Sequence, residues 1–138
     1  MIEHIGDLLS VTSGIIVHGC NAQGVMGSGV AAAIAAKWPG CYKIYNRSKL
    51  RLGSIIWYKV HDEQLYIANA ITQEHYGNDK VHLDYHALYD CMIVIASQRL
   101  PIHMPLIGCG LAGGRWEIAK PIIEAALGNT ETHLWRLK

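Results

Sequence analysis

The sequence has few charged residues and no long hydrophobic run. Asp, Glu, Lys and Arg make up 17% of its 138 residues, whereas hydrophobic residues make up 51%. This balance excludes an intrinsically disordered chain. The longest strongly apolar stretch, residues 29–36, is far shorter than the roughly 20 residues that span a bilayer. We therefore expect a folded protein with a single domain over residues 1–138 and no membrane association.

Neither sign of charge dominates the sequence. Twelve Lys and Arg stand against eleven Asp and Glu, which gives a formal net charge of +1. Because extended nucleic-acid binding relies on a basic surface, we expect none. The first ten residues lack the basic and apolar segments of a signal peptide. We therefore expect a cytoplasmic protein.

Patterns that bind metals or common cofactors are also missing. The four cysteines form no CxxC pair, which predicts reduced and mostly buried thiols. The P-loop pattern GxxxxGK[ST] is absent. We accordingly expect neither a metal site nor a cofactor.

Apolar segments of two kinds alternate along the chain. Short segments rich in β-branched residues predict strands, and longer segments predict helices. The expected strands span residues 2–5, 14–18, 54–60, 65–69, 102–107 and 132–137. The expected helices span residues 28–37, 41–50, 83–99 and 116–127. This alternation predicts an α/β fold: a three-layer α/β/α sandwich whose mixed sheet is largely parallel, with 54–60 and 65–69 forming an antiparallel hairpin.

Two glycine-rich loops each follow a predicted strand and precede a predicted helix. They run from Gly24 to Gly29 and from Gly108 to Gly114. Backbone N–H groups in such loops, together with a helix N-terminus, hold anions at the carboxyl ends of strands. Two of them favour a pyrophosphate site, although glycines also simply make tight turns. The second loop matches GxGxxG, but too little chain follows it to complete a dinucleotide-binding half.

A polar cluster lies between the strand at 14–18 and the first loop. His18 could act as a nucleophile or as a general acid or base toward a phosphoryl group, or it could only satisfy a backbone hydrogen bond. Cys20 fits a small buried residue better than a thiolate nucleophile. Asn21 could orient a ribose hydroxyl, cap the turn, or do both.

Other candidates lie near the chain ends and after the middle strand. Asp7 could accept a hydrogen bond from an adenine amino group or could begin a turn. Trp135 could stack on a base or belong to the core. The polar loop after residue 69 offers Gln73, Glu74 and His75 as further candidates.

Four segments of the sequence together resemble the macrodomain family, whose members bind ADP-ribose on a three-layer α/β/α fold. The segments are residues 6–9, 16–31, 104–116 and 133–137, in the family's order. Within the family, they resemble the branch with the yeast ADP-ribose 1''-phosphate phosphatase, the human terminal ADP-ribose glycohydrolase and the DNA-ADP-ribose glycohydrolase antitoxins. The resemblance implies that Asp7 holds the adenine, that Trp135 lies against it, and that the two loops hold the diphosphate and distal ribose. The implied ligand-binding residues are Asp7, Leu8, Asn21, Gly27, Ser28, Gly29, Val30, Gly108, Cys109, Gly110, Leu111, Ala112, Gly113 and Trp135.

Departures from that branch bear on the chemistry. The glycohydrolases resemble one another in having a lysine after the middle strand, whereas this chain has Thr72-Gln73-Glu74 there. The human enzyme also has an aspartate at the position where this chain has Ala112. His18 matches the catalytic histidine of the yeast-type phosphatase. The resemblance therefore implies hydrolysis of ADP-ribose 1''-phosphate through His18. The alternatives are a non-catalytic ADP-ribose reader, or a hydrolase that removes ADP-ribose from modified protein or nucleic acid.

Overall fold

The computed structural model describes residues 1–77, 79–109 and 112–137, and within them one six-stranded sheet. The strands lie in the order β1-β6-β5-β2-β4-β3. Neighbouring strands are parallel except β3 and β4, which form the predicted antiparallel hairpin. The bounds are β1 Ile2–Ile5, β2 Ser13–Asn21, β3 Ile55–Lys59, β4 Gln64–Gln73, β5 Ile102–Met104 and β6 Thr132–Arg136.

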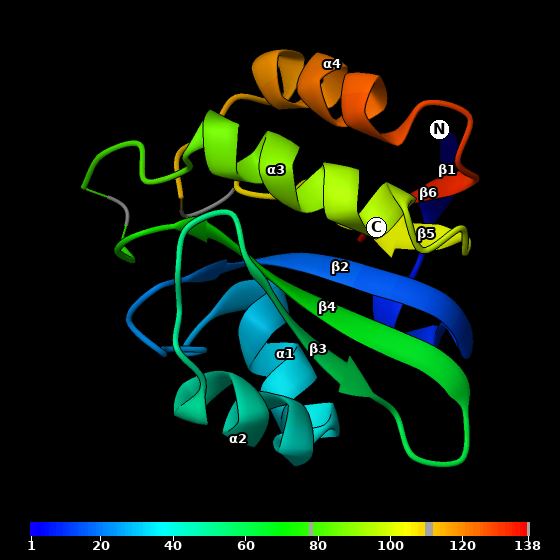
Figure 1. Cartoon of the computed structure of the whole chain (residues 1–138), viewed down its shortest axis with the longest axis horizontal. Helices are drawn as coiled ribbons and strands as arrows, with labels where there is room; N and C mark the ends of the chain where they lie inside the picture. The colour runs from blue at the N-terminus through cyan, green and yellow to red at the C-terminus, as the bar shows by residue number, and fades with distance from the viewer. Residues whose placement is uncertain (78, 110–111, 138) are drawn as a thin grey trace.

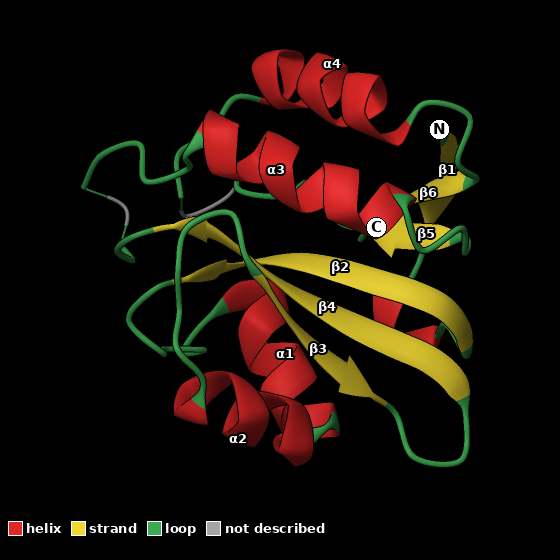
Figure 2. Cartoon of the chain, viewed as in Figure 1, coloured by secondary structure: helices red, strands yellow, loops and turns green. Residues whose placement is uncertain are grey.

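Helices cover both faces of the sheet, as Figures 1 and 2 show. Helices α3 and α4 lie over one face, and α1 and α2 lie over the other. The expected mixed three-layer α/β/α sandwich is thereby confirmed. No helix in the part of the chain described is long and apolar enough to cross a membrane. The bounds are α1 Gly29–Lys37, α2 Pro39–Arg47, α3 Tyr85–Ala96 and α4 Trp116–Leu127, with a 3₁₀ turn η1 at Leu8–Ser10.

Three strand predictions were wrong in length. The segment predicted as 14–18 begins at Ser13 and continues to Asn21. The segment predicted as 102–107 ends as a strand at Met104, because Pro105 has no N–H to donate to a neighbouring strand. The segment predicted as 65–69 continues to Gln73 instead of ending at Asn69. Its polar residues Asn69 and Thr72 suggested a loop, but both are buried in the structure.

The two faces of strand β2 pack against two separate hydrophobic cores. Ile15 and Val17 belong to the core under α3 and α4, whereas Ile16 belongs to the core under α1 and α2. Because side chains alternate along a strand, His18 and Cys20 follow Ile16 on the α1–α2 side. The strand therefore delivers a histidine and a thiol to the carboxyl end of the sheet.

Thr72 provides a test of how this part of the sheet is packed. Its side chain is fully buried, and its Oγ1 has no hydrogen-bond partner. Because a buried hydroxyl without a partner is unfavourable, we expect Thr72→Val to leave the free energy of unfolding unchanged or to raise it by about 1 kcal/mol. Urea unfolding of the two proteins measures this. A loss of more than about 1 kcal/mol would show that the hydroxyl has a partner, such as a bound water.

Candidate functional site

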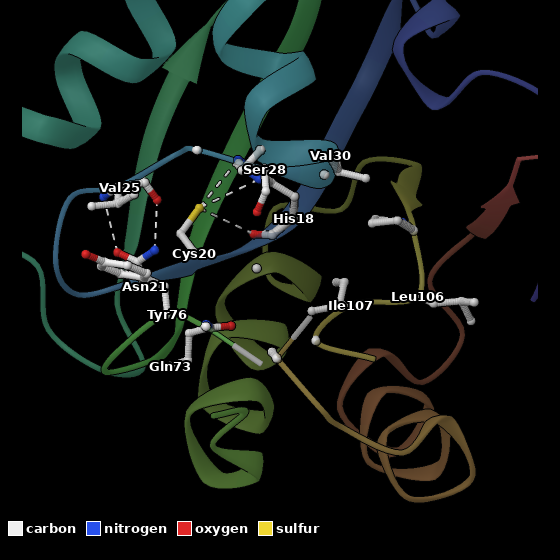
Figure 3. Close-up of a pocket in the computed structure, with 18 residues that line it drawn as sticks. His18, Cys20, Asn21, Val25, Ser28, Val30, Gln73, Tyr76, Leu106 and Ile107 are labelled. Carbon is white, nitrogen blue, oxygen red and sulfur yellow. Dashed lines mark hydrogen bonds between the residues drawn. The ribbon is translucent and has the colours of Figure 1, made fainter. Parts of the chain in front are cut away.

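A cavity of about 720 Å³ lies at the carboxyl ends of β2 and β4 and beyond the end of β5. Figure 3 shows residues of the β2–α1 segment on one side of it and Leu106 and Ile107 on another. The sheet thus brings the two glycine loops to one place, as predicted. The lining residues are His18, Gly19, Cys20, Asn21, Val25, Gly27, Ser28, Gly29, Val30, Ala31, Gln73, Tyr76, Gly77, Pro105, Leu106, Ile107, Gly108 and Ala112.

Asn21 shapes the first loop. Its Oδ1 accepts hydrogen bonds from the N–H groups of Gln23 at 3.0 Å and Val25 at 3.2 Å, and its Nδ2 donates to the Val25 carbonyl at 2.8 Å. The Tyr45 hydroxyl donates to the Asn21 carbonyl at 2.5 Å. These bonds show the turn-forming role that the sequence suggested for Asn21.

The N-terminus of α1 forms one wall of the cavity. Ser28 is the N-cap but makes no side-chain hydrogen bond to the first turn, and Gly29 has a φ of 59°, which favours glycine. The first N–H groups of a helix have no partner within the helix. Because Ser28, Gly29, Val30 and Ala31 all line the cavity, this wall can bind an anion.

The second loop closes the cavity from the side of β5. Gly108 and Ala112 line the cavity, whereas Cys109 and Gly113 do not. The Gly114 N–H donates to the Gly108 carbonyl at 2.7 Å and so holds the two ends of the loop together. The predicted ligand-binding residues Gly110 and Leu111 lie outside the described residues.

His18 lies in a buried polar cluster at the wall of the cavity. Its Nε2 is 2.5 Å from Asn69 Oδ1, and the Cys20 sulfur is 3.5 Å from Nε2 and 3.7 Å from Nδ1. Burial lowers the pKa of His18 to about 4, against the opposing effect of the hydrogen bond to Asn69. The imidazole is therefore neutral at pH 7 and suits a base or nucleophile rather than a proton donor.

Cys20 and Cys41, whose sulfurs lie 3.9 Å and 3.4 Å from Asn69 Oδ1, are both thiols. Burial raises the pKa of Cys20 well above its ordinary value, and burial raises the pKa of Cys41 to about 11. Because the thiolate is the reactive form, neither side chain is an activated nucleophile in this state. This agrees with the sequence interpretation of Cys20 as a small buried residue. Cys91 is buried as well, and Cys109 is half-buried.

Asp7, Leu8 and Trp135 do not line this cavity. The exposed Asp7 carboxylate accepts the Leu9 N–H at 2.9 Å and begins the η1 turn, and Leu8 is buried against the core. The Trp135 indole stacks on His4 at 4.3 Å and donates from Nε1 to His103 Nδ1 at 3.0 Å. For both residues the sequence offered an alternative to adenine binding. The contacts in the structure fit these alternatives: Asp7 forms a turn, and Trp135 packs as a core aromatic.

Several residues of the site were missed by the sequence analysis. Asn69 and Tyr45 were not singled out, yet Asn69 contacts His18 and Tyr45 anchors the first loop. Val25 lies in the first glycine loop and Tyr76 in the polar loop after residue 69, but neither was named as a candidate. A usable signal for Asn69 was an amide between alanines in a strand that is otherwise apolar. Of the second-rank candidates, Gln73 lines the cavity, whereas Glu74 and His75 do not.

The lining contains no Asp, Glu, Lys or Arg among the residues that the structure describes. A ligand with phosphate groups would therefore be held by backbone N–H groups and the α1 N-terminus rather than by side-chain cations. Within the same residues, no cluster of three His, Cys, Asp or Glu is placed to hold a metal ion. His18 is the lining side chain best suited to proton transfer or nucleophilic attack at neutral pH.

Comparisons with known proteins agree with this architecture. The sequence model described as the Macro domain matches residues 17–123. A 17.5 kDa protein of bacteriophage T4, from the tk-vs intergenic region, is 33% identical over 79% of this chain and 77% of its own length. A structure from Bacteroides thetaiotaomicron is 29% identical, with a TM-score of 0.87 over 99% of this chain and 97% of that one. Thermosipho africanus DarTG in complex with ADP-ribose is 20% identical, with a TM-score of 0.82 over 96% of this chain and 40% of that one.

Proposed function

This chain belongs to the Macro domain family, and we propose that it binds ADP-ribose and hydrolyses ADP-ribose 1''-phosphate to ADP-ribose and phosphate. The observation that carries the proposal is a neutral imidazole at the wall of a cavity formed between two glycine loops. The proposal groups the chain's activity with that of the yeast-type phosphatase rather than with the lysine-dependent glycohydrolases, and it is supported by the lack of a lysine in the described lining. It also assigns a role to His18, which is the side chain best suited to attack on phosphorus in the described lining.

The binding part of the proposal rests on the shape and donors of the cavity. The α1 N-terminus and the loop ends at Gly108 and Ala112 offer backbone groups to a diphosphate from two sides. A volume of about 720 Å³ is within the usual range of small-molecule sites. The fold is shared with a protein whose structure contains ADP-ribose, which supports the choice of this pyrophosphate ligand.

The chemical step uses the neutral His18 ring. As a nucleophile, a ring nitrogen forms a bond to phosphorus while the bond from phosphorus to O1'' breaks, and O1'' takes a proton from water to give ADP-ribose. Water then attacks phosphorus, the N–P bond breaks, and phosphate leaves. As a base, the same nitrogen takes a proton from a water that attacks phosphorus directly while the bond from phosphorus to O1'' breaks. O1'' then takes a proton from a second water, and the ring returns its proton to the hydroxide so formed. In both routes the backbone N–H groups stabilise charge on the phosphoryl oxygens.

A second candidate, a reader of ADP-ribose without catalysis, is favoured by the burial of His18. Its side chain is only 1% exposed, so little of the ring is open to a ligand. The third candidate is removal of ADP-ribose from a macromolecule. The described lining contains no carboxylate or lysine that could catalyse this reaction.

Two measurements separate these functions. Calorimetric titration with ADP-ribose tests binding, and release of inorganic phosphate from ADP-ribose 1''-phosphate tests hydrolysis. Binding together with phosphate release supports the proposal, and binding without release supports the reader. Release of ADP-ribose from modified protein or DNA, measured side by side, would support the third function instead. No binding of ADP-ribose at all would overturn the proposal.

Gly114 offers a test of the second loop. A Cβ at this position would lie 2.6 Å from the Gly108 carbonyl oxygen and 2.5 Å from Leu83 Cδ2. Because the backbone contact cannot be relieved by a side-chain rotation, we expect Gly114→Ala to displace Gly108 and to weaken ADP-ribose binding at least about tenfold. Calorimetric titration measures the change.

Gly128 is the matched control for that substitution. It ends α4 with a φ of 56°, and a Cβ there would meet nothing within 4 Å. Gly128→Ala should therefore lower stability by about 1 kcal/mol through backbone strain and leave ADP-ribose affinity unchanged. Equal affinities of the Gly114 variant and the wild type would contradict a binding role for the second loop.

A further inference from the structure

Asn69 lies directly opposite His18 in the sheet. The two residues are register partners on the parallel strands β2 and β4, and both side chains are buried. Their side chains meet at 2.5 Å, between His18 Nε2 and Asn69 Oδ1. A buried amide in an apolar strand requires hydrogen-bond partners, and Asn69 has them on both sides.

The orientation of the Asn69 amide follows from its other partner. Asn69 Nδ2 is 3.0 Å from the Ile56 carbonyl oxygen on β3. A carbonyl oxygen only accepts hydrogen bonds, so the NH₂ group of Asn69 must face Ile56. The amide oxygen then faces His18. This assignment does not depend on the chemistry of the site.

The amide orientation determines which nitrogen of His18 carries the proton. Asn69 Oδ1 can only accept, so the neutral ring must donate to it from Nε2–H. The lone pair of the neutral imidazole is then on Nδ1. The Cys20 sulfur lies 3.7 Å from that nitrogen and 3.5 Å from Nε2. The hydrogen bonds that fix the tautomer therefore run in one direction, from His18 Nε2–H to Asn69 Oδ1 and from Asn69 Nδ2 to the Ile56 carbonyl.

We propose that Asn69 is a positioning residue that holds His18 in the Nε2–H tautomer and makes Nδ1 the basic atom of the site. This deepens the proposed function and rests on it for its consequence, because Nδ1 is then the atom that attacks phosphorus or takes the proton from water. The polar groups around the ring are Cys20 on β2, Asn69 on β4 and, behind Asn69, Cys41 on α2. No charged side chain forms a hydrogen bond or ion pair with His18 among the described residues, so the amide sets the tautomer.

The tautomer can be measured without any activity. Long-range ¹H–¹⁵N correlation spectra of the neutral His18 ring report which nitrogen carries the proton. We expect a single Nε2–H form in the wild type and a population of the Nδ1–H form in Asn69→Leu. Thr72→Val is the control, since it removes a polar atom from an equally buried position of β4 and should leave the tautomer unchanged.

A second variant keeps the test valid if Asn69→Leu does not fold. Asn69→Asp retains an acceptor and adds a negative charge, so it should preserve Nε2–H and raise the pKa of His18 by at least about one unit. The acid limb of the phosphate-release profile should then move upward with it. An Nδ1–H ring in the wild type, or a pKa unmoved by the aspartate, would overturn the proposal. If the wild type releases no phosphate, the proposed hydrolysis fails, while the spectra still decide the role of Asn69.

Discussion

His18→Gln is expected to reduce phosphate release from ADP-ribose 1''-phosphate by at least about a hundredfold. Glutamine can still donate to Asn69 Oδ1 and fills similar space, but it offers no nitrogen lone pair to phosphorus or to a water. Positioned bases and nucleophiles contribute about a hundredfold or more to such reactions. The measurement is the initial rate of phosphate release by the variant and the wild type at saturating substrate.

The affinity for ADP-ribose distinguishes catalysis from binding in that experiment. Because the diphosphate would be held by backbone groups of the two loops, we expect His18→Gln to bind ADP-ribose within a few-fold of the wild type. His61→Gln serves as the control, since the His61 side chain is 92% exposed and does not line the cavity. Equal rates for His18→Gln and the wild type would remove His18 from the chemistry.

Much of the fold could be predicted from the sequence, because the segments that form strands and helices differ clearly in residue pattern. The β-branched residues Ile15, Ile16 and Val17 predicted a strand, and β2 is that strand, buried on both faces of the sheet. The two glycine loops were predicted to meet, and the parallel sheet brings them together because the carboxyl ends of parallel strands share one edge.

The partners of His18 could not be predicted from the sequence, because they depend on the register between strands rather than on the local residue pattern. Asn69 is 51 positions away, and its contact with His18 follows from the pairing of β2 with β4. The burial that makes the imidazole neutral is likewise a property of the packed helices α1 and α2. For Trp135, the sequence predicted a base or a core contact, and only the structure supplies the neighbouring His4 and His103.

The free energy of unfolding is expected to fall by up to about 3 kcal/mol as the pH is lowered from 6.5 to about 4. Burial holds the pKa of His18 at about 4 in the folded state, below its ordinary value of 6.5. The unfolded chain therefore binds a proton in this range that the folded protein does not, and each pH unit favours unfolding by about 1.4 kcal/mol. Above pH 6.5 the ring is neutral in both states, so the effect vanishes there. Urea unfolding across this range measures it.

Substitution of His18 separates its contribution from that of other groups. His18→Gln should flatten the dependence of stability on pH between 6.5 and 4, and the substitution His61→Gln, at a side chain that is 92% exposed, is the control. Part of the slope should persist in His18→Gln, since burial and the neighbouring His133 and His4 also lower the pKa of His103 to about 4. That part should be the smaller one, because His103 is only partly buried and solvent weakens its interactions. An unchanged slope in His18→Gln would show that His18 is protonated as readily in the folded protein as in the unfolded chain, and that would remove the argument for a neutral base.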